Sequence, residues 1–345
     1  MGSHFIAVSA HESIVAELGA LSHVNPFATA GFFESRRQLG YDTWVLGLRN
    51  ETNELVCGCG AFLRRGRLHC RLGIPSLPAV GADSSFWSGL REFCRHHGVT
   101  KVELGTFASP PAVEIPRFGT HFTRRCRCEF VLDLAGDLSA MLSVNHERNL
   151  KRAAKADLTV RRTRSVEASI THRALMSKSM DRRRSRGERV DRVGLSREEV
   201  AILQSGAGDL FQALRDATVL SSVLVLRAPG AGYYRSAGTS PEGMAMGASH
   251  FLIHRIAREL SAEGAQIFNL GGAAEGSGLA RFKEGFGASR VPLPAARCYI
   301  GSGWRLRASR AIDLMRSDRK ALLRLLTWAG DSSSTKGDGI EVLPR

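Results

Sequence analysis

Residues 271–287 read GGAAEGSGLARFKEGFG, and they follow directly on a short apolar run, QIFNL, at residues 266–270. A helix-like segment at residues 247–263 precedes that run, so the predicted order is helix, strand, glycine-rich loop and then a lysine, Lys283. Glycines allow a backbone to approach a bulky ligand closely. This stretch is therefore the strongest candidate in the chain for a functional site.

Four elements of this stretch stand in a fixed order: Gly-Gly, Gly-Leu, Phe-Lys and Gly-Phe-Gly. In this order they resemble the C-terminal signature of Fem-type aminoacyltransferases, a branch of the GNAT-like superfamily. Those enzymes join an amino acid to an amine, usually taking it from aminoacyl-tRNA. The resemblance is specific from Val219 to Gly287. It implies an acyltransferase that uses aminoacyl-tRNA as co-substrate, with no further cofactor.

The resemblance also implies an architecture: an α/β (α+β) chain of two tandem GNAT-like domains with mixed, largely antiparallel sheets flanked by helices. The pattern agrees, since each half shows a hairpin, a helix and a strand, at residues 56–72, 86–97 and 100–104 and again at 219–238, 248–261 and 266–270. A chain of 345 residues is long enough for two domains. We expect an N-terminal domain over residues 1–158, a C-terminal domain over 159–302, a basic amphipathic helix over 303–330 and a disordered tail over 331–345.

Charge points to the kind of partner. Lys and Arg number 48 against 33 Asp and Glu, which gives a net charge of +15 and a sequence pI near 10.2. Such a protein is attracted to polyanions such as RNA, phospholipid headgroups or a nucleotide-linked substrate. A solvated excess of arginine is the alternative. A non-enzymatic RNA-binding protein is also compatible with the charge, although the chain shows no aromatic RNA-stacking motif.

Cysteine usage and hydropathy suggest a cytoplasmic protein without integral membrane contact. The N-terminus lacks a basic region followed by an apolar run, and no segment approaches the roughly 18 apolar residues of a membrane span. The seven cysteines form no secretory framework, so reduced thiols are expected. Two Cys-x-Cys pairs, at Cys57 and Cys126, lack the common zinc spacing, and no metal site is expected.

Amide formation from an activated ester requires aligned reactants and a group that stabilises the oxyanion of the tetrahedral intermediate. By the resemblance, Lys283 meets the ester end of aminoacyl-tRNA and Phe282 positions it. The family also places a tyrosine of the inner hairpin strand against the acceptor. Tyr233 and Tyr234 are adjacent there, so only one can face the cleft. Tyr234 is the preferred choice, and packing within the strand pair is the alternative.

Basic side chains supply candidate phosphate contacts, although a solvated surface is the alternative for each of them. The resemblance implies that an arginine near the end of the first domain, Arg148, binds the diphosphate of the acceptor. Asn145 and Lys151 share its predicted helix face. Arg36 or Arg37 stands where the family has a phosphate-binding lysine. Contacts to tRNA are expected from Lys155 and from a basic run between the domains, at Arg182, Arg183, Arg184 and Arg186.

Other assignments stay open. Glu103 stands where an acidic residue would be convenient as a base. An acyl-CoA-dependent N-acyltransferase is the alternative function, but residues 241–248 read PEGMAMGA, with Glu242 where a pyrophosphate-binding loop carries a basic or amide residue. The acceptor can be a peptidoglycan-precursor peptide or a small amine of a natural-product pathway. The sequence does not identify the amino acid or the oligomeric state.

Overall fold

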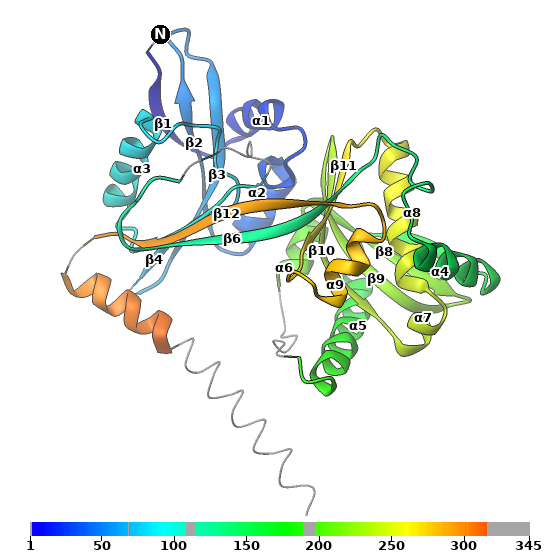
Figure 1. Ribbon diagram of the computed structural model, residues 1–345. Helices are drawn as coiled ribbons and strands as arrows, with labels where there is room; N and C mark the ends of the chain where they lie inside the picture. Colours follow the sequence, from blue (N-terminus) through cyan, green and yellow to red (C-terminus); the bar gives the residue numbers. More distant parts are fainter. Residues whose placement is uncertain are drawn as a thin grey trace, which may run out of the picture.

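In the computed structural model, strands from both halves of the chain form one continuous sheet with helices on its faces (Figure 1). The structure describes residues 2–67, 69–107, 113, 115–188, 197–301 and 303–315. The twelve strands lie in the order β1-β2-β3-β4-β5-β12-β6-β11-β10-β9-β8-β7. The predicted mixed α/β class is confirmed, and the strands of the two halves are joined in one sheet rather than separate.

The first half holds six strands and four helical segments. Their bounds are β1 (His4–Ser9), α1 (Glu12–Leu21), the 3₁₀ helix η1 (Pro26–Ala28), α2 (Ala30–Gln38), β2 (Asp42–Arg49), β3 (Leu55–Arg65), β4 (Cys70–Ile74), α3 (Ser85–His96), β5 (Lys101–Gly105) and β6 (Thr120–Asp133).

The second half begins with a helix and ends with a long strand. Its elements are α4 (Val144–Lys155), β7 (Thr159–Thr163), α5 (Val166–Ser185), α6 (Glu198–Gln204), β8 (Gly208–Arg215), β9 (Thr218–Ala228), β10 (Ala231–Thr239), α7 (Pro241–Ala245), α8 (Ala248–Ala262), β11 (Ile267–Gly272), α9 (Gly278–Glu284) and β12 (Ser289–Tyr299). Residues 303–315 are helical as well, and the remainder of the predicted C-terminal helix and the tail lie outside the described residues.

Strands β6 and β12 connect the halves. They pair antiparallel with each other from Ser289↔Val131 to Tyr299↔Thr120. The far end of β12, residues 295–299, pairs with β5 of the first half, while residues 129–133 of β6 pair with β11 of the second. Figure 1 shows the two strands running side by side from one half to the other. The boundary expected at residue 158 stays a prediction; it falls between α4 and β7.

Serine side chains define where several helices begin. The hydroxyl of Ser143 accepts from the backbone N–H of His146, so α4 starts at Val144. Ser277 in the same way accepts from the N–H of Ala280 and starts α9, the helix that carries Lys283. The cap therefore determines the residue at which α9 begins, and with it the place of the candidate catalytic lysine on this helix.

A hydrophobic core shared by the halves holds their junction. Phe33 from α2, Ile202 from α6 and Leu224 from β9 are all fully buried in it. Phe27 of η1 packs its ring edge-on against the rings of Phe107 and Tyr233, with centroids 4.9 and 5.5 Å away. Aromatic pairs in this arrangement add to the stability that burial supplies. The junction therefore positions residues of both halves around one space.

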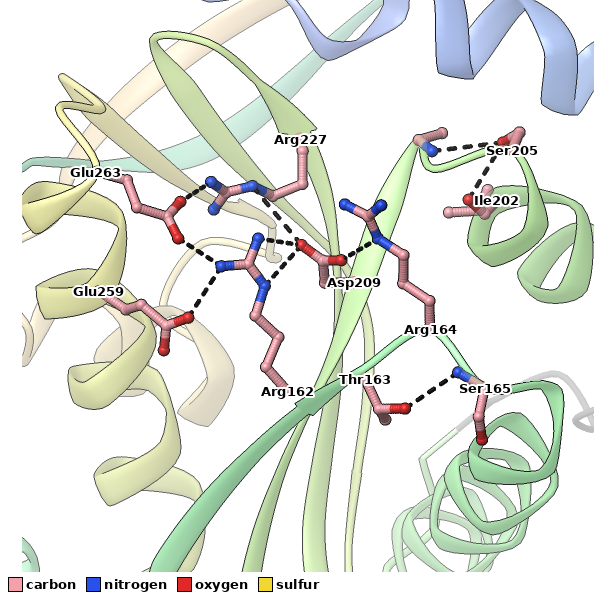
Figure 2. Close-up of polar contacts among 11 residues, drawn as sticks. Arg162, Thr163, Arg164, Ser165, Ile202, Ser205, Asp209, Arg227, Glu259 and Glu263 are labelled. Carbon is pink, nitrogen blue, oxygen red and sulfur yellow. Dashed lines mark hydrogen bonds and ion pairs between the residues drawn. The ribbon is translucent and has the colours of Figure 1, made fainter.

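At the opposite edge of the sheet, a buried carboxylate organises an ion-pair network (Figure 2). Asp209 of β8 is only 2% exposed, and its Oδ2 lies 2.5 Å from Nη2 of Arg162 on β7. Arg162 also reaches Glu259 of α8 at 3.0 Å, and Arg164 donates to Oδ1 of Asp209 at 2.5 Å. The network ties edge strand β7 to helix α8.

Candidate functional site

A cavity of about 510 Å³ lies between the two halves. Much of its wall is apolar, as in most small-molecule sites, and charged groups of both signs interrupt it. The aromatic and aliphatic walls include Phe27, Phe32, Tyr41, Phe62, Leu72, Ile74, Tyr233 and Leu293, and the charged groups are Arg36, Arg64, Arg71, Glu103, Glu198 and Arg235. The cavity thus suits a ligand with both apolar and charged parts.

Arg36 is the N-terminal candidate that the structure brings into the cavity. Its guanidinium lies 4.4 Å from the centre of the Phe32 ring and donates to Glu198 at 2.7 Å. Arg235 binds the same carboxylate at 3.0 Å. Burial alone would raise the pKa of Glu198, but Arg235 and Arg36 outweigh it and hold that pKa below its usual range. Glu198 is therefore an ionised counter-ion to two cavity arginines.

Arg37 points elsewhere. It donates to the carbonyl oxygen of Ala10 and to Glu34 at 3.2 Å, and it does not line the cavity. Adjacent residues on a helix project in different directions, which separates Arg37 from Arg36. Of the two candidate arginines, only Arg36 is available to a ligand in the cavity.

The two adjacent tyrosines of β10 lie on opposite faces of the sheet. Tyr233 lines the cavity, is 9% exposed, and donates from its hydroxyl to Oε1 of Glu129 at 3.0 Å. Tyr234 packs on the other face, against the core beneath α8. It is thus Tyr233, and not the preferred Tyr234, that lines this cavity, and a catalytic role of Tyr234 stays a prediction. Strand alternation predicts that one tyrosine faces in, but it does not predict which.

Lys283 sits at a fork in the sheet. Strands β10 and β11 pair in parallel from Ala231↔Ile267 to Tyr233↔Asn269, and the register ends there although both strands continue. Lys283 is 4% exposed, and its Nζ donates at 2.8 Å to the carbonyl oxygens of both Gly271 and Gly272 at the end of β11. The ammonium also lies 5.9 Å from the centre of the Tyr234 ring. The predicted glycine-rich turn therefore holds the predicted lysine directly.

A chain of hydrogen bonds joins this lysine to the cavity. Glu129 is fully buried and accepts from the hydroxyl of Tyr233 at 3.0 Å and from Nδ2 of Asn269 at 2.7 Å. The side-chain oxygen of Asn269 in turn accepts from the backbone N–H of Gly271 at 2.7 Å. Burial lowers the pKa of Lys283 to about 8, and the charge of Glu129 acts against that shift. The polar chain thus runs from the cavity wall to the fork.

Glu129 and Asn269 were not among the sequence candidates. Each is a polar residue in or beside an otherwise apolar strand, Phe130–Leu134 for the first and Gln266–Leu270 for the second. A carboxylate is rarely buried without a partner. A charged residue next to an apolar strand is thus a usable signal, but it does not name the partner.

Phe282 anchors the helix that carries Lys283. Its ring lies 4.9 Å from that of His250 and 5.5 Å from that of His146, between α4 and α8. Its carbonyl oxygen lies 2.8 Å from Nε2 of His146, which is 3% exposed. Burial lowers the pKa of His146, so the ring is neutral near pH 7 and Nε2 donates to that carbonyl. Phe282 therefore holds α9 in place and Lys283 with it.

The structure does not bring the α4 candidates to the cavity. Asn145, Arg148, Lys151 and Lys155 are exposed, and none of them lines it. Helix α4 lies against α8 on the outer side of the second half (Figure 1). Asn145, Arg148 and Lys151 therefore lie away from this cavity, and their role in acceptor binding stays a prediction. Long-range placement of a helix does not follow from its own periodicity.

The basic run after residue 180 extends a helix. Residues 181–185 form the last turn of α5. Acidic neighbours balance part of the charge: Arg184 pairs with Asp181 at 2.7 Å, and Glu188 binds Arg183 at 2.7 Å and Arg186 at 2.9 Å. Arg182 donates to the carbonyl oxygen of Thr239 at 2.6 Å. None of these arginines lines the cavity.

Three further observations bear on the chemistry. Glu103 lines the cavity but is bound by Lys101 at 2.9 Å and by Arg297 at 3.2 Å. Burial acts to raise its pKa, and these cations lower it overall, so Glu103 is a weak base. Among the described residues, no three His, Cys, Asp or Glu side chains gather as metal ligands would. Within the same part of the chain, every helix is too short or too polar to cross a membrane.

Comparison with known proteins shows which family model and which solved structures this chain is similar to. A family model described as the acetyltransferase (GNAT) domain matches residues 144–284. The structure of FemX superposes with a TM-score of 0.64 at 13% identity, over 85% of this chain and 97% of that one. L-PGS from Bacillus licheniformis gives a TM-score of 0.52 at 13% identity over 86% of this chain and 95% of that one. No curated protein matches the sequence.

A tandem GNAT protein from the clavulanic acid biosynthesis pathway also has this fold, with a TM-score of 0.51 and 12% identity over 88% of this chain and all of that one. Identities this low establish the fold and leave substrates open. The matched domain covers α4 to α9, and therefore the fork and Lys283. A GNAT-domain model thus matches residues 144–284, and the chain shares its fold with FemX, in agreement with the resemblance first indicated by residues 271–287.

Proposed function

We propose that this protein forms an amide bond by transferring an aminoacyl group from aminoacyl-tRNA to an amine of an acceptor held in the cavity. The observation that carries the proposal is Lys283, a buried ammonium at the end of β11 with two of its three N–H groups on the carbonyls of Gly271 and Gly272. The third N–H has no protein acceptor among the described residues and is available to a substrate oxygen.

The reaction balances without another reagent. The acceptor nitrogen attacks the ester carbonyl carbon, a C–N bond forms, and negative charge collects on the carbonyl oxygen. Collapse of this intermediate breaks the C–O bond to the ribose, and the proton lost by the amine ends on the ribose hydroxyl. A preorganised cation beside the developing oxyanion accelerates this step. With a pKa of about 8, Lys283 is mostly charged at pH 7 and can take that part.

The arrangement of the sheet supports two substrates that meet at the fork. Tyr233 and the cavity lie on one face, and Lys283 with Tyr234 lies on the other. In the proposed reaction the acceptor fills the cavity with its amine beyond Tyr233, and the ester approaches from the side of Lys283. The net charge of +15 favours a polyanionic donor such as tRNA.

An acyl-CoA donor is the competing function, because the matched family model is described as an acetyltransferase domain. A pyrophosphate site of this kind needs free N–H groups at the start of a helix. The start of α8 lies against α4: a methyl group added at Gly247 would be 2.5 Å from the carbonyl oxygen of Asn149. Glu242 in the preceding helix α7 also disfavours an anion. Both observations favour the aminoacyl-tRNA donor.

Binding discriminates the two donors. Purified protein is titrated with labelled aminoacyl-tRNA and, separately, with acetyl-CoA, each at two salt concentrations. We expect tight, salt-sensitive binding of charged tRNA and none of acetyl-CoA. Saturable acetyl-CoA binding with only loose, non-selective tRNA association would overturn the proposal. The substitution Lys283→Ala should leave tRNA binding intact, since tRNA is held mainly through its phosphates.

A further inference from the structure

A row of cations crosses four adjacent strands next to the cavity. Arg64 on β3 is directly opposite Arg71 on β4, which is opposite Lys101 on β5, which is opposite Tyr299 on β12. Three positive charges and one phenol therefore stand side by side on one face. Like charges directly opposite each other on neighbouring strands destabilise a sheet. Such a row implies a compensating anion.

Part of that compensation comes from the chain itself. Asp313, in the helical segment 303–315, places one carboxylate oxygen 2.5 Å from Nη2 of Arg71. Its other oxygen lies 2.9 Å from Nζ of Lys101 and accepts from the hydroxyl of Tyr299 at 3.0 Å. Lys101 is 4% exposed, so its ion pair with Asp313 is a buried contact and not a surface pair. The row thus already binds carboxylates of the protein: Asp313 at Arg71 and Lys101, and Glu103 at Lys101.

The cavity end of the row is different. Arg64 and Arg71 both line the cavity. The guanidinium of Arg64 lies 5.3 Å from the centre of the Tyr41 ring, and among the described residues no carboxylate pairs with it. Planar guanidinium groups favour phosphate and carboxylate, which they can bind through two parallel hydrogen bonds. Both guanidinium groups line the cavity, and among the described residues Asp313 is the carboxylate that pairs with Arg71.

We propose that Arg64 and Arg71 form an oxyanion subsite of the cavity, and that Asp313 is an internal counter-ion which the ligand's oxyanion replaces at Arg71. The ligand class is an acceptor that carries a phosphate or carboxylate group next to an apolar part. That apolar part packs on the Tyr41 and Phe62 side of the cavity. This inference rests on the proposed function in one respect: it takes the cavity as the acceptor site.

The test measures binding without transfer. Phenyl phosphate and phenylacetate share an aromatic ring and differ in their oxyanion, so the pair separates a phosphate ligand from a carboxylate ligand. Each is titrated into the full-length protein at low and high salt and followed by ligand-observed NMR. We expect at least one of them to bind. Arg64→Gln should weaken that binding about tenfold or more, because it removes a charge-assisted hydrogen bond.

Asp313→Asn should have the opposite effect and strengthen binding several-fold, because Arg71 loses its competing carboxylate. The matched control is Arg95→Gln: Arg95 is 80% exposed on α3 and pairs with Glu92 of the same helix, so the substitution should leave binding unchanged. Circular dichroism and thermal unfolding confirm the fold of each variant. Arg64 is exposed, whereas Arg71 is half-buried. The test therefore relies on Arg64→Gln, and it stays valid even if a second variant, Arg71→Gln, fails to fold.

Several outcomes would overturn the proposal. These are absence of binding of both probes, equal binding by wild type and Arg64→Gln, or weaker binding by Asp313→Asn. Failure of the proposed function is distinguishable. If the probes bind as expected but no charged tRNA is used, the subsite stands and the donor assignment fails. If transfer occurs but Arg64→Gln leaves the acceptor KM unchanged, the subsite fails alone.

Discussion

The ammonium nitrogen of Lys283 lies 2.8 Å from the carbonyl oxygen of Gly271, and that carbonyl points toward the lysine because Gly271 has a φ of +74°. A side chain at this position would be strained, since L-residues rarely adopt positive φ. The backbone geometry and the lysine are thus one unit. This unit places a cation at the fork between β10 and β11, and no group of the described residues accepts from its third N–H.

Burial of Lys283 makes stability depend on pH above neutrality. Its pKa is about 8 in the folded chain and 10.5 ordinarily, so between these values the unfolded chain holds the extra proton. The free energy of unfolding should therefore increase as the pH rises from 8 to 10.5, by on the order of 3 kcal/mol at most. Urea unfolding of wild type and Lys283→Met at pH 7.5 and 10 measures it. Parallel pH dependence in both proteins would refute the shifted pKa.

Glu129 should tune this lysine. Its negative charge supports the ammonium, so Glu129→Gln removes that support and lowers the pKa of Lys283 further. The descending alkaline limb of the transfer rate should shift to lower pH by a measurable fraction of a unit. Glutamine has nearly the same size as the glutamate that it replaces, which accepts from both Tyr233 and Asn269, so the substitution changes mainly the charge. An unchanged alkaline limb would show that Glu129 does not act on Lys283.

The motif around Lys283 was predictable because all its parts are contiguous: a strand, glycines, a capping serine and the Phe-Lys pair. The partners of the site were not, because they come from distant strands. Asn269 and Glu129 are 140 residues apart and meet only through the β11–β6 pairing. The row from Arg64 to Tyr299 likewise depends on register across four strands. Alternation could not choose between Tyr233 and Tyr234, and helix periodicity could not place α4.

The network of Figure 2 should be a major support of the far edge of the sheet. Asp209 is 2% exposed and binds both Arg162 and Arg164, so Asp209→Ala removes a charge-assisted partner from each of them. Arg162 keeps Glu259 and Glu263, and Arg164 is 54% exposed, so we expect a loss of about 1.5–3 kcal/mol in unfolding free energy. The control Glu259→Gln removes a partner of Arg162 that is 37% exposed, and should cost less than about 1 kcal/mol. Equal losses for the two variants would show that burial of Asp209 is not decisive.

A buried histidine should add acid sensitivity. His172 is fully buried, with Nδ1 2.9 Å from Oγ of Ser222 and Nε2 2.9 Å from Oγ of Ser236. Burial, with a smaller effect of Arg173, lowers its pKa to about 4. The unfolded chain therefore binds the extra proton between pH 6.5 and 4, and stability falls as pH drops through that window.

The variant His172→Gln tests this account. Its unfolding free energy should fall less than that of wild type between pH 7 and pH 5, by about 2 kcal/mol, since each pKa unit is worth about 1.4 kcal/mol. His250, whose pKa burial also lowers to about 4, remains as an internal reference. A pH dependence identical to that of wild type would show that His172 titrates normally.

The most direct test of the central claim is single-turnover transfer of label from each charged tRNA to an acceptor amine, with a UDP-linked peptidoglycan peptide and a panel of small amines as acceptors. We predict amide product with at least one pair, and a loss of about a hundredfold or more in rate for Lys283→Met with unchanged tRNA binding, since removal of an oxyanion-stabilising donor costs this much. Full transfer by Lys283→Met would contradict the assigned role. Transfer from acetyl-CoA alone would contradict the aminoacyl-tRNA donor.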